Sequence, residues 1–228
     1  MDTALDWVVF LKRLPSLFLG LFLFSLGIVA ILQSNLGMMP WGVLNVGLAK
    51  VTPFTIGQAS QIIGLLVIII SYPLGFTPGL GTLANMFFVG YFMDLIIWWN
   101  LIPMQTELPG QLVLLLLSVM ILGFASLLYL RVQLGAGPRD GLMLGVIKKL
   151  DKPVAYVRAA IEVAVLTLGF LMGGPVGIGT VVSALTVGIS VQFFFKLGHF
   201  NGKSSQIDLL QLYRFLKKPQ KPKSTTHE

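Results

Sequence analysis

The sequence contains no cysteine, which excludes disulfide bonds, thiolate metal sites and cysteine nucleophiles. Charged residues make up only 11% of the 228 residues, against roughly 25% in a soluble globular domain. So few charges cannot cover a water-exposed surface. Both histidines, His199 and His227, lie near or within the polar C-terminal segment. The sequence therefore predicts neither a metal site nor a bound cofactor.

Hydrophobic residues make up 55% of the chain and gather in runs of about 20 residues. Such a run, as a helix rising 1.5 Å per residue, crosses a hydrocarbon core roughly 30 Å thick. In lipid the backbone must satisfy its own polar groups, and uninterrupted apolar runs favour helices over a barrel. The first run, from about Leu14 to Leu32, exceeds a signal-peptide core and predicts a retained span. The predicted fold class is an all-α polytopic membrane helix bundle.

The net charge of +7 arises mainly near the C-terminus, where seven of the sixteen basic residues fall within 196–223. We interpret residues 196–228 as a basic cytoplasmic tail that contacts water and lipid head groups. No nucleic-acid-binding motif is present. A short amphipathic surface helix is predicted from Ile207 to Phe215.

The chain repeats itself at a spacing of 98 residues without a gap. Between Leu36 and Asp94, 14 of 59 positions are identical to their counterparts 98 residues later, where roughly five are expected by chance. Glycine and proline dominate the matches, so the two halves share backbone geometry. The sequence predicts one membrane domain of two tandem repeats, residues 14–101 and 112–195.

Each half predicts three long spans and one short helix that follows an L-G-x-x-P loop. The short helices are predicted from Pro40 to Val51 and from Pro138 to Leu150. Proline suits the first position of a helix, and the loop glycine permits a sharp entry turn. Twelve helical residues cover only about 18 Å, so each short helix is predicted to be re-entrant or interfacial.

Three crossings per half place the two repeats in opposite orientations in the membrane, as in many transporters. A cytoplasmic N-terminus puts the connection from Leu101 to Gly110, which has no Lys or Arg, outside. Five basic residues then lie inside, namely Arg131, Arg139, Lys148, Lys149 and Lys152. Eight crossings remain the alternative. The predicted location is the inner (plasma) membrane of a cell, with both termini cytoplasmic.

The motifs LGMMPWGVLNVGL and TPGLGT, then LGAGPRDGLMLG and VGIGT, resemble the YczE/YyaS/YitT family of bacterial membrane proteins. The resemblance covers most of the chain and is closest to the YczE-like branch. It implies a multi-spanning bacterial inner-membrane fold and no settled substrate or catalytic residue. The pattern of that branch, LGxxPWDVL, has Asp where this sequence has Gly42, so no acid role is expected there.

The start of the second short helix carries the strongest local signal, Arg139 and Asp140. A helix N-terminus with an adjacent arginine suits a carboxylate or a phosphate. Asp140 could instead cap the helix or pair with Arg139. The matching loop of the first half offers Asn35, Trp41 and Asn45. If the two loops converge, these five residues form a substrate pocket with one cationic wall and one stacking, hydrogen-bonding wall.

Arg158 and Glu162 stand four residues apart within a predicted span, on one helical face. They are predicted to serve in ion coupling or as a buried pair. Glu162 is the better candidate for proton coupling, because a desolvated carboxyl group binds a proton more readily. Asp94 is predicted to be interfacial.

Two further sets of residues are predicted to have structural roles. Thr82 and Thr180 are expected to cap the helices that follow the G-x-G-T turns. Five glycines are expected to permit close helix packing, namely Gly20, Gly27, Gly64, Gly90 and Gly188.

The first functional hypothesis is a secondary transporter or permease for a small, anionic or zwitterionic organic solute. The alternative is a non-transporting accessory or scaffold protein whose loops or tail recruit a partner. No enzyme activity is expected, since no span carries a Ser/His pair, a zinc motif or a close carboxylate dyad. The expected partners are the solute and the lipid bilayer, and the sequence leaves a homo-oligomer open.

Overall fold

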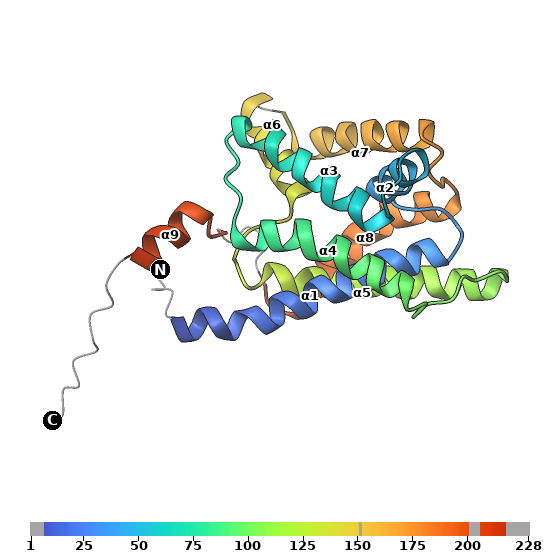
Figure 1. The fold of residues 1–228 in the computed structure, drawn as a ribbon, viewed down its shortest axis with the longest axis horizontal. Coiled ribbons are helices and arrows are strands. Elements are labelled where there is room, and N and C mark those ends of the chain that lie inside the picture. Colours follow the sequence, from blue (N-terminus) through green and yellow to red (C-terminus); the bar gives the residue numbers. More distant parts are fainter. Residues whose placement is uncertain (1–6, 151, 201–205, 218–228) are drawn as a thin grey trace.

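A computed structural model describes residues 7–150, 152–200 and 206–217. All regular structure within these residues is helical (Figure 1). The elements are α1 (Trp7–Gln33), α2 (Pro40–Val51), α3 (Ile56–Ser71), the short 3₁₀ helix η1 (Tyr72–Leu74), α4 (Leu80–Trp98), α5 (Leu108–Leu130), α6 (Pro138–Leu150), α7 (Val154–Leu171), α8 (Ile178–Leu197) and α9 (Leu209–Lys217).

Six of the described helices are long and apolar enough to cross a membrane: α1, α3 with η1, α4, α5, α7 and α8. The helices α2 and α6 have 12 and 13 residues and reach only about 18 to 20 Å. Both begin at the proline predicted from the sequence. The all-α fold class is thereby confirmed for the described residues, and the six long apolar helices support a multi-spanning membrane protein.

The turns before α2 and α6 use the glycines of the L-G-x-x-P loops. Gly37 has a φ of +103° and Gly135 a φ of +123°, values that residues with a side chain rarely adopt.

The threonines of the G-x-G-T turns act differently from the prediction. The helices begin two residues before Thr82 and Thr180, and each threonine Oγ1 accepts the N–H of the glycine that precedes its helix.

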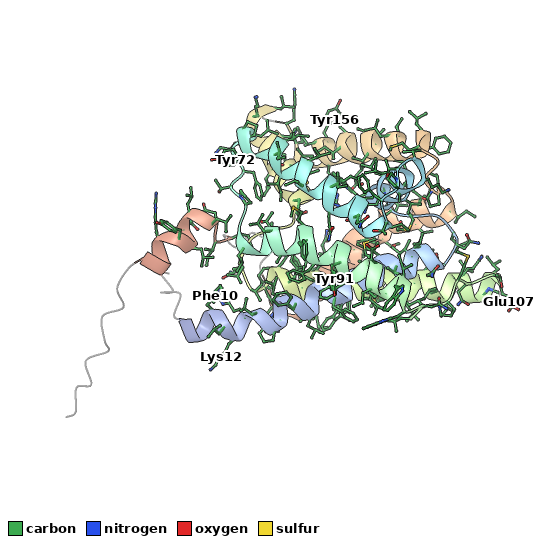
Figure 2. All side chains as sticks on the ribbon, viewed as in Figure 1. Phe10, Lys12, Tyr72, Tyr91, Glu107 and Tyr156 are labelled. Carbon is green, nitrogen blue, oxygen red and sulfur yellow. The ribbon has the colours of Figure 1, made fainter. Side chains whose placement is uncertain are left out.

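The helices form two layers (Figure 1). One layer holds α1, α4, α5 and α8, with α1 against α5 at its centre, and the other holds α2, α3, α6 and α7. The two central helices run antiparallel. Ser16 near the start of α1 donates to the Leu128 carbonyl near the end of α5, and the Gln105 N–H just before α5 donates to the Gln33 carbonyl. Figure 2 shows Lys12 and Glu107 toward opposite ends of the molecule.

Glycine permits the closest approaches between helices, as predicted. A Cβ atom added at Gly20 would lie 2.8 Å from the Tyr129 nitrogen, and one at Gly27 would lie 2.7 Å from Leu122 Cγ. Gly64 and Gly90 contact Met86 and Gly57 in the same way. The prediction for Gly188 is wrong, because open space faces this glycine where α7 stands away from α8.

Hydrogen bonds join the two halves of the chain in reciprocal pairs. The Gly81 N–H donates to the Leu134 carbonyl at 2.6 Å, and 98 residues later the Gly179 N–H donates to the Leu36 carbonyl at 2.7 Å. In each half of the chain, the first turn of the last long helix is therefore hydrogen-bonded to the loop that leads into the short helix of the other half.

The residues after α8 return to the bundle. The Ile207 N–H donates to the Gln133 carbonyl and the Leu209 N–H to the Pro78 carbonyl. The helix predicted from Ile207 to Phe215 is present as α9, with Leu212 buried and Leu210 exposed. Residues 201–205 and 218–228 of the predicted tail lie outside the described residues.

Candidate functional site

The two short helices meet at their N-terminal ends. Trp41 and Arg139 are the second residues of α2 and α6, and they occupy equivalent positions, 98 residues apart. The Arg139 guanidinium carbon lies 4.9 Å from the centre of the Trp41 ring. A cation above an aromatic face is attracted by the ring's electrons, the more so where water is excluded. The structure therefore brings together Trp41 and Arg139, two of the five residues named for the pocket.

A cavity of about 290 Å³ opens beside this contact and takes its walls from both repeats. Its charged wall consists of Arg139, Asp140 and Arg158. Its neutral polar wall is formed by five side chains, those of Ser60, Asn85, Ser126, Tyr129 and Gln192. The remainder of the lining is apolar, so these few polar groups would determine how a bound molecule is oriented.

A second cavity of about 150 Å³ lies between α7 and α8. It shares Trp41, Arg139, Asp140 and Arg158 with the first cavity and adds Glu162 and Ser183. The shared residues form the wall between the two spaces. A molecule that moved from one cavity to the other would therefore pass along the Arg139 and Arg158 side chains.

Two basic and two acidic side chains make up the charged part of the site. Arg158 Nε lies 3.0 Å from Glu162 Oε1, the pairing expected for residues four apart on a helix. The Asp140 carboxylate interacts electrostatically with the guanidinium groups of Arg158 and Arg139, and its Oδ2 lies 3.5 Å from the Tyr129 hydroxyl. The four charges sum to zero. Because the group contains both carboxylates and guanidinium groups, it can bind either a cationic or an anionic part of a ligand.

The Arg158–Glu162 pair is formed but is not buried. The exposed fractions of its side chains are 54% and 29%, because α7 makes little contact with α8 along this face. An ion pair that is open on one side can exchange its partners for a ligand more easily than a buried pair can, since less desolvation has to be reversed.

The two asparagines predicted to line the pocket, Asn35 and Asn45, have different surroundings. Asn35 lies in a left-handed turn after α1, with a φ of 57°, exposed and outside both cavities. Asn45 is 1% exposed, and neither its amide nitrogen nor its carbonyl oxygen has a hydrogen-bond partner among the described residues. A buried amide without a partner costs about 1–3 kcal/mol. Asn45 lines neither cavity, so the structure does not place this predicted pocket residue in the site.

No group of three or more potential metal ligands occurs in the described part of the chain. The site therefore consists of guanidinium, carboxylate, amide, hydroxyl and aromatic groups. Such groups bind and orient an organic ion through charge-assisted hydrogen bonds and stacking.

Several lining residues were missed in the sequence, although the repeat contains a signal for two of them. Ser60 and Asn85 are the counterparts of Arg158 and Ser183 at the 98-residue spacing, and both pairs line the cavities. Polar groups at equivalent depths of apolar spans could have singled them out. Tyr129 gave no such signal, because a tyrosine near the end of a span is typical of a membrane interface.

A family model described as a family of unknown function, DUF6198, matches residues 11–196. The chain belongs to this family. The chain is 38% identical to an uncharacterised protein from Haemophilus influenzae over 191 residues, which cover 84% of the chain and 87% of that relative. No solved structure matches it.

Two relatives from Bacillus subtilis confirm the resemblance that the motifs predicted. The chain is 33% identical to the uncharacterized membrane protein YczE over 185 residues, which cover 77% of the chain and 82% of YczE. It is 28% identical to the uncharacterized protein YyaS over 194 residues, with coverages of 82% and 94%. Gly42 packs against Met38. Asp140 stands 98 residues after Gly42, so of these two equivalent positions only the one in the second half of the chain has an acid.

Proposed function

We propose that this protein is a secondary transporter for a small zwitterionic or anionic organic solute, built from two inverted repeats. The observation that carries the proposal is the meeting of the two short-helix N-termini, through Trp41 and Arg139, beside a cavity lined by charges. Discontinuous helices whose N-terminal ends point at a central site are typical of transporters with inverted repeats. This step is an analogy of architecture, which is why binding has to be measured.

The reciprocal hydrogen bonds support the repeat. Gly81 binds Leu134 while Gly179 binds Leu36, the exchange of partners expected of two units related by a twofold axis. The equivalent helices α1 and α5 run antiparallel, so this axis lies across the helices. A twofold axis across membrane-spanning helices lies in the plane of the bilayer, which inverts one repeat relative to the other.

The distribution of basic residues supports an orientation with both termini cytoplasmic in a plasma membrane. Arg13 Nη1 donates to the Val132 carbonyl, which places the basic start of α1 beside the loop that contains Arg131. The opposite end of the bundle has Lys50, and the connector from Leu101 to Glu107 has no Lys or Arg. Basic residues accumulate on the cytoplasmic side of membrane proteins.

This orientation predicts which side labels an introduced cysteine. Because the chain has no cysteine, a single Met104→Cys thiol in the exposed connector is the only target of a maleimide. We expect a membrane-impermeant maleimide to label it in intact cells, and to label the control Lys149→Cys only after lysis. Labelling of Lys149→Cys alone in intact cells would reverse the proposed orientation.

The charges of the site indicate the class of solute. Arg139 and Arg158 with the partial positive charge of two helix N-termini suit a carboxylate, whereas Asp140 and Glu162 suit an amine or its cation. The larger cavity, about 290 Å³, is close to the lower end of ligand pockets of roughly 300–1,000 Å³. A solute with the size and charges of an amino acid matches both properties.

A thermal-shift screen of the purified protein tests solute binding. A ligand of the folded state adds about 2.7 kcal/mol to the free energy of unfolding at a concentration 100 times its Kd, and this raises the unfolding temperature. We expect at least one zwitterion or carboxylate in a panel of amino acids, carboxylates and amines to stabilise the wild type and Arg131→Gln. Arg139→Gln should lose this shift, because Arg139 lines both cavities. Arg131 is exposed outside the cavities, so Arg131→Gln is the matched control.

An accessory role is the second candidate, and α9 is the feature that favours it. Leu210 is 58% exposed on this short helix, and basic residues follow it in the sequence. A screen without any stabilising solute, together with capture of one stoichiometric partner that is lost in Leu210→Asp, would replace the transport proposal by this one.

A further inference from the structure

The two repeats differ most in how their last two spans pack. In the first repeat, α3 lies against α4: Gln61 Nε2 donates to the Phe87 carbonyl at 2.9 Å, and Gly90 contacts the Gly57 carbonyl. In the second repeat, the equivalent helices α7 and α8 make almost no contact. Gly188, the counterpart of Gly90, has no atom of another residue within reach of an added Cβ.

The carboxylate of Asp94 holds α3 and α4 together. Its Oδ1 accepts the Gly57 N–H at 2.8 Å, and its Oδ2 accepts the Thr55 hydroxyl, so it binds the N-terminal end of α3. A negative charge is favourable there, because the first N–H groups of a helix have no partner within the helix. Asp94 was predicted to be interfacial, and this contact between spans was missed.

The second repeat lacks the groups that build this contact. The counterparts of Asp94, Thr55 and Gly57 are Gln192, Pro153 and Ala155. Proline has no hydroxyl, alanine adds a methyl group where Gly57 meets Gly90, and glutamine has no charge. Glu162 also stands where α3 has Gly64, so a charged side chain occupies the face of α7 that would approach α8.

The two helix pairs act at opposite ends of the bundle. Asp94 lies one turn before the end of α4, which leads into the connector without Lys or Arg. The N-terminal half of α7, with Arg158 and Glu162, follows Lys148 and Lys149 at the basic end. The smaller cavity lies between α7 and α8 and reaches Trp41 and Arg139. The site is therefore accessible along α7 and α8, while α3 and α4 close the other approach.

We propose that α3–α4 and α7–α8 are the two gates of the central site, and that Asp94 with Thr55 and Gly57 is the lock of the outer gate. The structure has the outer gate closed and the cytoplasmic gate open. When the protein changes to the outward-open state, α7 closes on α8 as α3 separates from α4. Each helix pair then takes the packing that its counterpart has in this structure. This inference rests on the proposed inverted-repeat transporter, in which alternating access is a gating movement of one repeat against the other.

Cross-linking between matched pairs of introduced cysteines tests the gates without any solute. The pair Gly64→Cys/Met86→Cys spans α3–α4, because a Cβ atom added at Gly64 would lie 3.6 Å from the Met86 Cβ, and Glu162→Cys/Ala184→Cys occupies the same positions of α7–α8. With the protein in lipid nanodiscs and a short thiol-specific cross-linker, we expect the first pair to react in most molecules. The second pair should react several-fold more slowly, because its helices are apart.

Asp94→Asn, added to each pair, tests the lock. It removes a charge-assisted contact of the kind that shifts an equilibrium roughly tenfold or more. Cross-linking of the α3–α4 pair should fall and that of the α7–α8 pair should rise. Glu107→Gln is the matched control, because it neutralises an exposed acid at the same end of the bundle outside the lock, and it should leave both yields unchanged.

Equal cross-linking of the two pairs in the wild-type background would overturn the inference, and so would yields that Asp94→Asn leaves unchanged. The comparison of the two cysteine pairs needs no Asp94 variant. It therefore tests whether α3–α4 is closed and α7–α8 open even if Asp94→Asn fails to fold. If Asp94→Asn shifts the two cross-linking yields but no solute is transported, the two gates are supported and the transport proposal is removed. If solute is transported but Asp94→Asn leaves the yields unchanged, only the inference about the gates is removed.

Discussion

Replacing Arg139 by glutamine should lower solute uptake into proteoliposomes at least tenfold, for the solute that stabilises the wild-type protein. Hydrogen bonds to a charged group contribute about 1.5–3 kcal/mol, which corresponds to roughly a tenfold to hundredfold change in affinity. Glutamine keeps hydrogen-bonding atoms but loses the charge, the bidentate fork and the interaction with the Trp41 ring. Uptake of the radiolabelled solute below saturation measures the effect.

One control separates this loss from misfolding, and a second variant tests the same site. Arg131→Gln removes the same charge outside both cavities and should keep wild-type uptake. Glu162→Gln should also lower uptake, because it replaces the negatively charged partner of Arg158, 3.0 Å away, by a neutral amide. Monodisperse Arg139→Gln and Glu162→Gln proteins that both retain uptake would remove the assigned site.

Replacing Gly169 by alanine should lower the stability of the whole bundle. A Cβ atom at this position of α7 would lie 2.6 Å from the Leu44 Cα and would also contact the Leu44 nitrogen. Both atoms belong to the backbone of α2, so α2 and α7 have to separate. Overpacking of this kind costs about 1–3 kcal/mol. We expect a fall in the unfolding temperature in detergent, measured by size-exclusion chromatography after heating.

Gly188→Ala is the matched control, because Gly188 lies in the next span of the same repeat and an added Cβ meets no atom there. Alanine is more favourable than glycine within a helix by about 1 kcal/mol, so this variant should be as stable as the wild type or slightly more so. Equal losses in the two variants would show that α2 does not pack on α7 as described.

The sequence predicted the helices closely, because their boundaries are set by local chemistry. Pro40 and Pro138 begin the short helices, where a residue without an N–H loses no hydrogen bond. The spans were visible because the bilayer demands about 20 apolar residues in a row. The threonine caps were misplaced by three residues, because a G-x-G-T turn does not reveal whether the glycine or the threonine ends the irregular backbone.

The candidate site was predicted in part. Trp41 and Arg139 came from the loops of the repeat, and the structure brings them into contact. Asn35 was included because it is polar and near the loop, yet its left-handed turn keeps it away from the cavities. Tyr129 joins the site from a different span, and proximity of that kind is not recorded in local sequence.

The sequence by itself determined that the chain is a helical membrane protein with two matching halves, because solvent preference and helix termini depend on the composition and spacing of neighbouring residues. Only the tertiary structure decided that α3 packs on α4 while α7 stands away from α8. Gly90 and Gly188 occupy equivalent positions, yet Gly90 contacts the backbone of Gly57 whereas Gly188 faces open space. Packing depends on all the facing side chains together, and those of the two repeats differ at Asp94 and Gln192.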